Sequence, residues 1–158
     1  MSESVLKGVE LVNAKGEIVQ GDDVTKSVAL AFYFAADWCP DCRDFQPTLN
    51  KFYERVNAGS KRLELVFVSS DGSQEAQAAH LKDKQGPWWS IPFESPLRNE
   101  LKRKYAVAAG KELAEVGLTA RKAGIPGLVV VQPNGDVIKL FDDSELAGDG
   151  LKELEQLL

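Results

Sequence analysis

The sequence contains few of the residues that build metal sites and disulfide scaffolds. Its 158 residues include two cysteines and one histidine. A structural zinc site takes four ligands, so Cys39, Cys42 and His80 are too few, and we expect no metal. A secreted disulfide scaffold uses more cysteines, spaced to join distant segments. The two cysteines here lie three positions apart, which indicates a chemical rather than a structural role.

Positive charge and long apolar runs are also scarce. The formal net charge is −5, which argues against non-specific binding of nucleic acid and gives no reason to expect a membrane surface as partner. The longest apolar run, over 28–36, is far too short to cross a bilayer. Residues 1–12 are too polar for a secretory signal. We therefore expect a soluble protein of the cytoplasm.

Apolar patterns predict a series of strands and helices. Continuous apolar runs are typical of strands covered on both faces, and apolar steps of three and four make one helix face apolar. The expected strands lie at 28–35, 63–68, 128–131 and 137–141 with a hairpin over 9–19, and the expected helices lie at 40–59, 75–84, 97–105 and 151–158. This order predicts an α/β fold, a central mixed β-sheet flanked by helices on both faces, in a single domain over 1–158.

Cys39 and Cys42 stand where a buried strand is expected to end and a helix to begin. A helix N-terminus offers unpaired N–H groups and the positive end of the dipole, and both stabilise a thiolate. Pro40 suits the first helical turn because that position needs no donor. We expect Cys39 to be the exposed nucleophile and Cys42 to resolve the mixed disulfide. Two core cysteines without chemistry are the alternative, but a Cys-x-x-Cys pair at this place favours a redox role.

The motif from Trp38 to Cys42, after an aromatic strand, resembles that of the thioredoxin superfamily. The resemblance is closest to its tryparedoxin and nucleoredoxin branch, and it covers the chain from about Lys7 to Phe141. Four further stretches carry it, at 32–36, 68–71, 87–93 and 124–128. The resemblance implies a thioredoxin-like fold.

The resemblance also implies a substrate-binding surface around the cysteines. The Ile125–Pro126 peptide bond is expected to be cis and to lie beside Cys39, where the backbone of an incoming substrate can pair. An ordinary proline at a strand start is the alternative there. Trp38 and Pro40 are expected to join this surface, although a partly buried aromatic is an equal alternative for Trp38.

Three positions are candidate modulators of the pair. Tyr33 takes the place at which ordinary thioredoxins carry a buried aspartate. Asp41 stands where tryparedoxins usually carry a second proline, and its charge is expected to change the redox poise. Asp71 ends a strand and could move protons near Cys42, although a solvated turn aspartate is the more common case.

Other features depart from the family or are expected to be structural. Fifteen extra residues, at 108–122, precede Ile125 and are expected to add a helical turn or two near the active face. His80 lies in a polar helix and is expected to face solvent. The run Lys102–Lys104 is expected to be a solvated helix face.

These features predict a thiol–disulfide oxidoreductase that uses Cys39 and Cys42 to reduce disulfides of protein partners, such as peroxidases. A low-molecular-weight dithiol or a reductase would supply the electrons; the resemblance implies a bis-glutathione conjugate or glutathione itself. No bound cofactor is expected, because only thiols change state. The alternative is a nucleoredoxin-like binding module, in which the redox state of the pair sets the affinity for a signalling partner.

Overall fold

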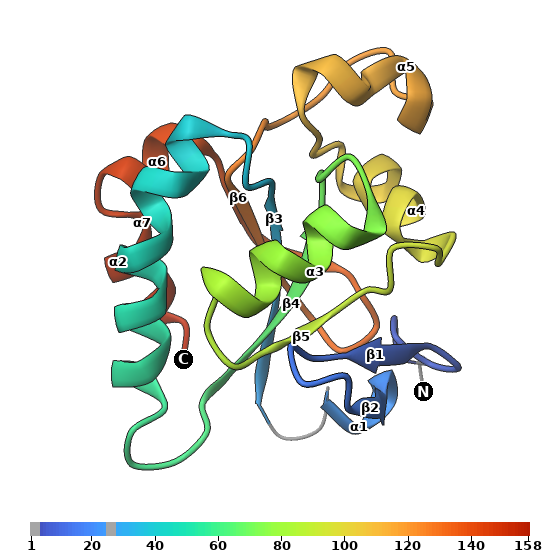
Figure 1. The fold of residues 1–158 in the computed structure, drawn as a ribbon. Helices are drawn as coiled ribbons and strands as arrows, with labels where there is room; N and C mark the ends of the chain where they lie inside the picture. Colours follow the sequence, from blue (N-terminus) through green and yellow to red (C-terminus); the bar gives the residue numbers. More distant parts are fainter. Residues whose placement is uncertain (1–3, 25–27) are drawn as a thin grey trace.

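Strand β3 (Ala29–Ala35) occupies the middle of the sheet, as its unbroken apolar run predicts. It pairs in parallel with β4 (Leu63–Ser69) on one side and antiparallel with β6 (Gly127–Val131) on the other. The computed structural model describes residues 4–24 and 28–158. Within that part of the chain, seven strands form one mixed sheet in the order β2-β1-β5-β4-β3-β6-β7 (Figure 1).

The remaining elements complete the predicted order. The other strands are β1 (Glu10–Val12), β2 (Ile18–Gln20), β5 (Trp89–Ser90) and β7 (Val137–Phe141). The helices are α1 (Gly21–Val24), α2 (Pro40–Val56), α3 (Gln74–Asp83), α4 (Leu97–Tyr105), α5 (Leu113–Val116), α6 (Asp143–Ala147) and α7 (Gly150–Gln156), with a 3-10 turn η1 (Gly110–Glu112). The expected hairpins β1–β2 and β6–β7 are confirmed. The single domain predicted over 1–158 includes residues 1–3 and 25–27, which lie outside the described residues.

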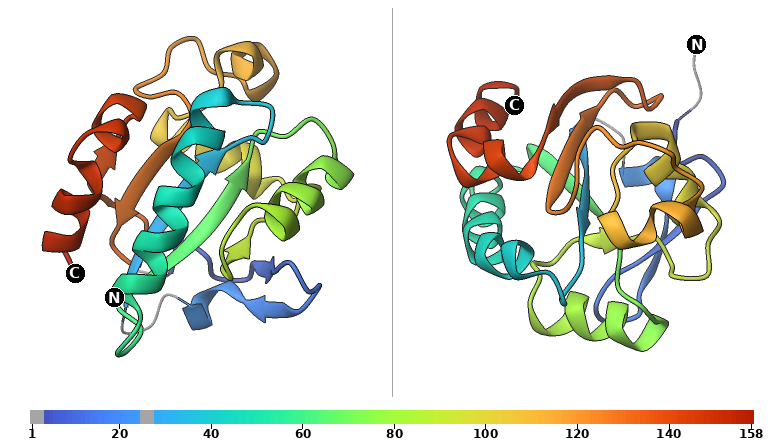
Figure 2. Two further views of the ribbon diagram at one scale, coloured as in Figure 1. Left: turned by 60° about the vertical axis from the view of Figure 1, so that its left-hand side comes forward. Right: turned by 90° about the horizontal axis from the view of Figure 1, so that it is seen from above.

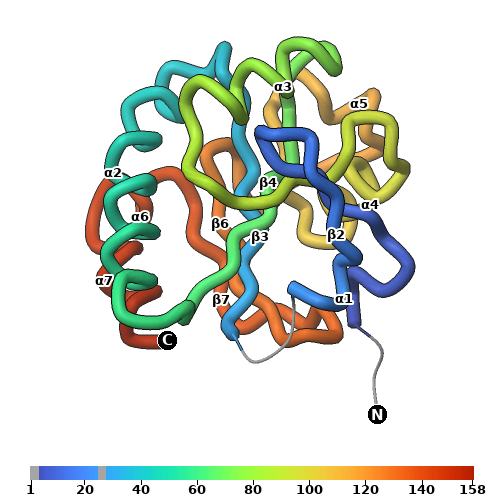
Figure 3. Tube along the Cα trace, turned by 60° about the horizontal axis from the view of Figure 1, so that its bottom comes forward, coloured from blue at the N-terminus to red at the C-terminus, as the bar shows by residue number. Residues whose placement is uncertain are grey.

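Helices cover both faces of the sheet, so the predicted α/β layering is confirmed (Figure 2). Successive residues of the central strands point to opposite faces, and two separate cores result. In β3, Ala31, Tyr33 and Ala35 enter the first core, under α2, α3, α6 and α7, whereas Leu30, Phe32 and Phe34 enter the second, under α4 and the N-terminal segment. Figure 3 shows α2, α6 and α7 on one side of β3 and β4, with β2, α1 and α4 on the other.

One end of the sheet collects the segments that matter for chemistry. Because β3 and β4 are parallel, their C-terminal ends meet at the same edge. Helix α2 begins there, and α5 lies at the same end of the molecule (Figure 1). The extra residues at 108–122 form η1 and α5, as the expected helical turn or two, and a parallel bridge between Val107 and Ala123 joins their two ends.

None of the helices in the described part of the chain combines the length and the apolar character needed to cross a membrane.

Candidate active site

Cys39 caps the N-terminus of α2. Its backbone is extended, with φ −85° and ψ 116°, and Pro40 takes the first helical position. The Cys39 sulfur accepts a hydrogen bond from the backbone N–H of Cys42 at 3.2 Å. The sulfur thus lies at the positive end of the helix dipole and receives one of the N–H groups of the first turn. The local fold therefore gives Cys39 the environment of a nucleophile.

Cys42 lies deeper than Cys39. Their exposed fractions are 1% and 6%, and both are free thiols. Burial raises the pKa of the Cys42 thiol well above its usual range, and the interaction with Cys39 raises it further. Cys42 is therefore protonated at neutral pH. The small exposure of Cys39 corrects the expectation of an exposed nucleophile: it packs in the first core, with Ile125 against that core.

The loop before β6 approaches the Cys39 sulfur. The Ile125–Pro126 peptide bond is cis, as the resemblance predicts. The Cys39 thiol donates to the carbonyl oxygen of Ile125, with 3.8 Å between sulfur and oxygen. Strand register explains the approach: Phe34 pairs with Gly127, so the residues before Gly127 reach the sheet edge at which β3 ends.

Tyr33 is fully buried in the first core, on the same strand that leads to the cysteines. Its hydroxyl donates to Oε1 of Gln46 in α2 at 2.8 Å, and its ring meets Trp88 edge-on. Burial raises the pKa of Tyr33 well above its usual value, and electrostatic interaction with the nearby cysteine pair adds to the rise. Tyr33 is therefore a neutral phenol that ties β3 to α2.

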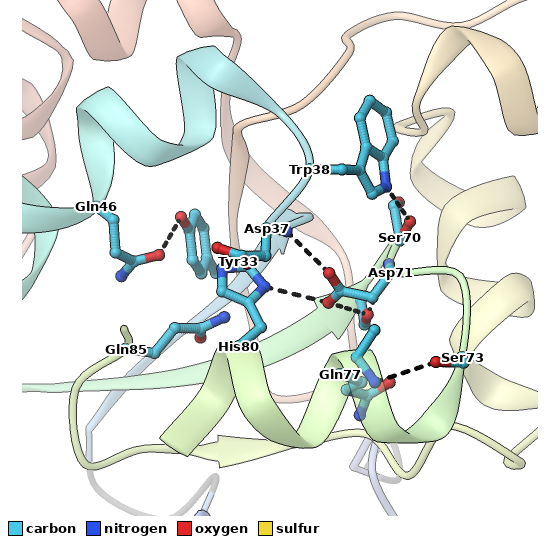
Figure 4. A network of polar contacts seen from close by, with 12 residues as sticks. Tyr33, Asp37, Trp38, Gln46, Ser70, Asp71, Ser73, Gln77, His80 and Gln85 are labelled. Carbon is cyan, nitrogen blue, oxygen red and sulfur yellow. Dashed lines mark hydrogen bonds and ion pairs between the residues drawn. The ribbon is translucent and has the colours of Figure 1, made fainter. Parts of the chain in front are cut away.

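Residues after β4 hold the segment that precedes Cys39 (Figure 4). The indole N–H of Trp38 donates to the Ser70 carbonyl at 2.9 Å, and the Asp37 backbone N–H donates to Oδ1 of Asp71 at 2.8 Å. Trp38 is 39% exposed. The indole is thus anchored at its nitrogen while part of its ring stays open to a partner.

Asp71 belongs to a buried polar cluster. Its Oδ2 accepts from the Ser69 hydroxyl at 2.7 Å and lies 3.1 Å from Nδ1 of His80. Burial alone would raise the pKa of Asp71, but hydrogen bonds from His80, the Asp37 N–H and Ser69 outweigh it and lower that pKa. In the described part of the chain the Asp71 carboxylate bonds only to these three groups, so it has no direct bond to Cys42.

His80 is buried, which corrects the expectation that it faces solvent. Its exposed fraction is 3%, and its ring packs edge-on against Phe67, with 5.1 Å between centroids. Gln77, His80 and Leu81 form the buried face of α3. Their spacing of three and four residues is that of one helix face, but two of the three are polar, so the sequence pattern does not mark this face as buried. Among residues 4–24 and 28–158, no three His, Cys, Asp or Glu side chains are grouped as a metal ion requires.

A buried ion pair anchors the segment 108–122, and no sequence pattern predicts it. Lys102 is fully buried, and its Nζ lies 3.1 Å from Oε2 of Glu112. This corrects the expected solvated face, of which only Arg103 and Lys104 are exposed. Burial lowers the pKa of Lys102, and the charge of Glu112 opposes that shift. Oε1 of Glu112 accepts from the Ser70 hydroxyl at 2.6 Å. Ser70 therefore connects this segment to Trp38.

Two hollows flank the cysteines, and they differ in the balance of charged side chains that line them. A cavity of about 540 Å³ lies beside Pro126, and its acidic lining residues are Asp41, Asp44, Asp143 and Asp149. A smaller cavity of about 240 Å³ lies beside Trp38. Its charged lining residues are the cations Arg98 and Lys111 and the acids Asp71, Glu112 and Glu115. The Lys111 Nζ stands 3.6 Å from the centroid of the Trp38 ring. The flank beside Pro126 thus carries four aspartates and one lysine, Lys152, whereas the flank beside Trp38 is of mixed charge and places a lysine on the indole ring.

Curated relatives carry the nucleoredoxin name. Nucleoredoxin-like protein 1 from Homo sapiens is 32% identical over 79% of this chain and 50% of its own length. Nucleoredoxin from Bos taurus is 27% identical over 88% of this chain and 28% of its own length. The chain therefore spans half or less of the length of these relatives.

Solved structures of thioredoxin-like proteins match almost the whole chain. A thioredoxin from Wuchereria bancrofti has a TM-score of 0.76 at 32% identity and covers 98% of this chain and 99% of its own. Native tryparedoxin I from Crithidia fasciculata has a TM-score of 0.70 at 27% identity, covering 94% and 92%. The sequence profile of a thioredoxin-like family matches residues 27–137. With the cysteine pair at the start of α2, these matches show that the chain belongs to the thioredoxin-like family, near its nucleoredoxin and tryparedoxin members.

Proposed function

We propose that this protein is a thiol–disulfide oxidoreductase that reduces disulfides of partner proteins. The Cys39 thiolate attacks one sulfur of the partner disulfide, a mixed disulfide forms, and the other partner sulfur leaves as a thiolate. Cys42 then loses its proton and attacks the Cys39 sulfur. The Cys39–Cys42 disulfide forms, and the second partner thiol leaves. The partner gains two electrons and two protons, and an external dithiol or a reductase returns them to the pair.

The placement of the Cys39 sulfur carries this proposal. It accepts the Cys42 N–H at 3.2 Å, at the positive end of α2, and lies 3.8 Å from the carbonyl of Ile125. One side of the sulfur thus stabilises a thiolate, and the other borders backbone against which a substrate strand can lie. We infer that Trp38, Pro40, Ile125 and Pro126 form the surface that binds the partner.

The finer assignments follow from the resemblance rather than from the geometry. In this proposal the partners include peroxidases, and the donor is a low-molecular-weight dithiol or a reductase. The proposed location, the cytoplasm, comes instead from the amino-acid composition and its short apolar runs. Tyr33, Asp41 and Asp71 modulate the pair. Of these, Asp41 has a direct physical basis, because its charge is one cause of the raised pKa of Cys42.

Turnover tests the proposal. With excess dithiothreitol, the wild-type protein should reduce insulin disulfides over many cycles, and Cys39→Ser should abolish turnover. Cys42→Ser should stop at the mixed disulfide, and so trap a partner covalently. A protein that binds a partner differently in its two redox states, yet does not turn over, would instead be the redox-sensing module.

A further inference from the structure

The segment 108–122 is held in place by specific hydrogen bonds, although it has no part in the proposed chemistry. The guanidinium of Arg121 donates to the Ala108 carbonyl at 2.8 Å, which ties the end of the segment to its start. Arg103 of α4 donates to the carbonyl of Val116, at the end of α5, at 2.7 Å. These two bonds fix the backbone at the start of the segment and at the end of α5. Its position relative to the cysteines is therefore defined.

Glu112 sets that position. One oxygen pairs with buried Lys102, and the other accepts from the Ser70 hydroxyl at 2.6 Å and the Ala109 N–H at 3.1 Å. The Ser70 carbonyl in turn accepts the indole N–H of Trp38. Ser70 thus bonds to Glu112 through its hydroxyl and to Trp38 through its carbonyl. Removing one partner of the buried Lys102–Glu112 ion pair would be costly, so Glu112 is held firmly in this position.

Lys111 precedes Glu112 in the chain and is carried onto Trp38 by this link. Its Nζ lies 3.6 Å from the centroid of the Trp38 ring, and the side chain is exposed. A cation over an indole face is an attractive contact. Among residues 4–24 and 28–158, no carboxylate forms an ion pair with Lys111. The ammonium is therefore available to a partner, immediately beside the residue that precedes Cys39.

We propose that Lys111 and Trp38 form a docking edge that selects protein disulfides flanked by an acidic residue. This preference rests on the proposed disulfide reduction, and it specifies which partner disulfides the protein reduces fastest. A carboxylate beside the partner's cysteine would reach Lys111 while the disulfide meets Cys39. The opposite flank strengthens the preference, because the hollow beside Pro126 is lined by four aspartates against one lysine, Lys152, and this excess of negative charge repels an acidic residue there.

The other charges around the hollow beside Trp38 are already engaged, with one exception. Asp71 is bonded to His80, Ser69 and Asp37, and Glu112 is paired with Lys102. Arg98 donates to two backbone carbonyls. Glu115 is exposed and lines the same hollow, so it competes with a partner for Lys111. An exposed ion pair in water changes a rate by only about two- to fivefold, and that is the preference we expect.

Three disulfide peptides that differ in one residue beside the cysteine test the proposal. That residue is Glu, Gln or Lys, and kcat/KM is measured with excess dithiothreitol at low and at high salt. The wild type should reduce the Glu peptide about two- to fivefold faster than the Gln peptide. The preference should shrink at high salt, because salt screens exposed charges.

Variants assign the preference to this edge. Lys111→Met keeps the aliphatic contact with Trp38 and should bring the Glu-to-Gln ratio to one. Lys111→Glu should favour the Lys peptide, and Glu115→Gln should enlarge the wild-type preference. Lys104→Met is the matched control, since the Lys104 ammonium also stands over a ring, that of Tyr105, and its ratio should equal that of the wild type.

Three outcomes would overturn the proposal: equal rates for all peptides with wild type, a preference that survives in Lys111→Met, or its equal loss in Lys104→Met. If the wild type reduces none of the peptides, disulfide reduction itself is wrong.

Discussion

The backbone N–H of Cys42 donates to the sulfur of Cys39 across 3.2 Å, while the Cys42 thiol is itself buried. The two sulfurs of one motif therefore have different environments. One lies at the helix terminus and receives a hydrogen bond, and the other is desolvated and held as a thiol. We expect this asymmetry to determine which cysteine reacts first.

Limited alkylation of the reduced protein at neutral pH should modify Cys39 before Cys42. The raised pKa of Cys42 keeps it a thiol, and the thiolate is the species that alkylates. Mass spectrometry after brief exposure to iodoacetamide measures the order. Cys42→Ser should be labelled at Cys39 at a similar rate. Labelling of Cys42 before Cys39 would contradict the assignment of nucleophile and resolver.

Replacing Asp41 by proline should raise the reduction potential by roughly 10–30 mV, because an exposed charge is worth little in water. Asp41 lies in the first turn of α2. Its negative charge repels the Cys39 thiolate, so removing it stabilises the reduced form. A glutathione redox titration measures the shift.

Two further variants separate charge from the proline ring. Asp41→Asn should give a shift of the same sign, and Glu54→Gln, on an exposed position late in α2, should give none. An unchanged or more negative potential in Asp41→Pro would show that this charge does not tune the pair.

Asp71→Asn should destabilise the protein at pH 7 by about 1–3 kcal/mol, because a buried, charged hydrogen-bond acceptor is lost. The pKa of Asp71 is lowered in the folded state, despite burial, by its hydrogen bonds. Its contribution is therefore complete above the unfolded pKa of about 3.9 and is lost as the pH falls through the folded value. Urea unfolding of both proteins between pH 7 and pH 2 measures this. A difference that stays constant down to the lowest pH would refute the role of the ionised carboxylate.

Tyr33→Phe should reduce the unfolding free energy by about 1–3 kcal/mol, because Oε1 of Gln46 loses a buried donor. The pH profile of insulin reduction should keep its shape, since the raised pKa of Tyr33 leaves it a neutral phenol throughout the working range. Chemical denaturation and the rate profile between pH 6 and pH 9 test the two parts. A shifted profile with unchanged stability would make Tyr33 a proton-transfer group instead.

Local patterns predicted most of the fold. The unbroken apolar run before the cysteines predicted β3, and Pro40 marked the first position of α2. Both signals act within a few residues, so no knowledge of distant partners is needed. The place of Pro126 beside Cys39 depends on the antiparallel pairing of β3 with β6, and only the resemblance to a known family anticipated it.

Buried polar pairs could not be predicted in the same way. His80 and Lys102 lie in helices whose surroundings in sequence are polar, and polar side chains are usually exposed. Each is buried because a specific acid meets it, Asp71 for His80 and Glu112 for Lys102. The partners come from different elements, so the pairing follows from tertiary packing.

The pairing of Phe34 with Gly127 restricts where such a chain can gain or lose residues. One residue added within β3 would reverse its two faces and move Cys39 along the sheet by about 3.3 Å relative to Pro126. The segment 108–122 lies outside both strands, and its ends are joined at Val107 and Ala123. Insertions and deletions there leave the strand register intact. Partner preference in a lineage of such proteins can therefore diverge through changes in length of this one segment, while the cysteine chemistry is inherited unchanged.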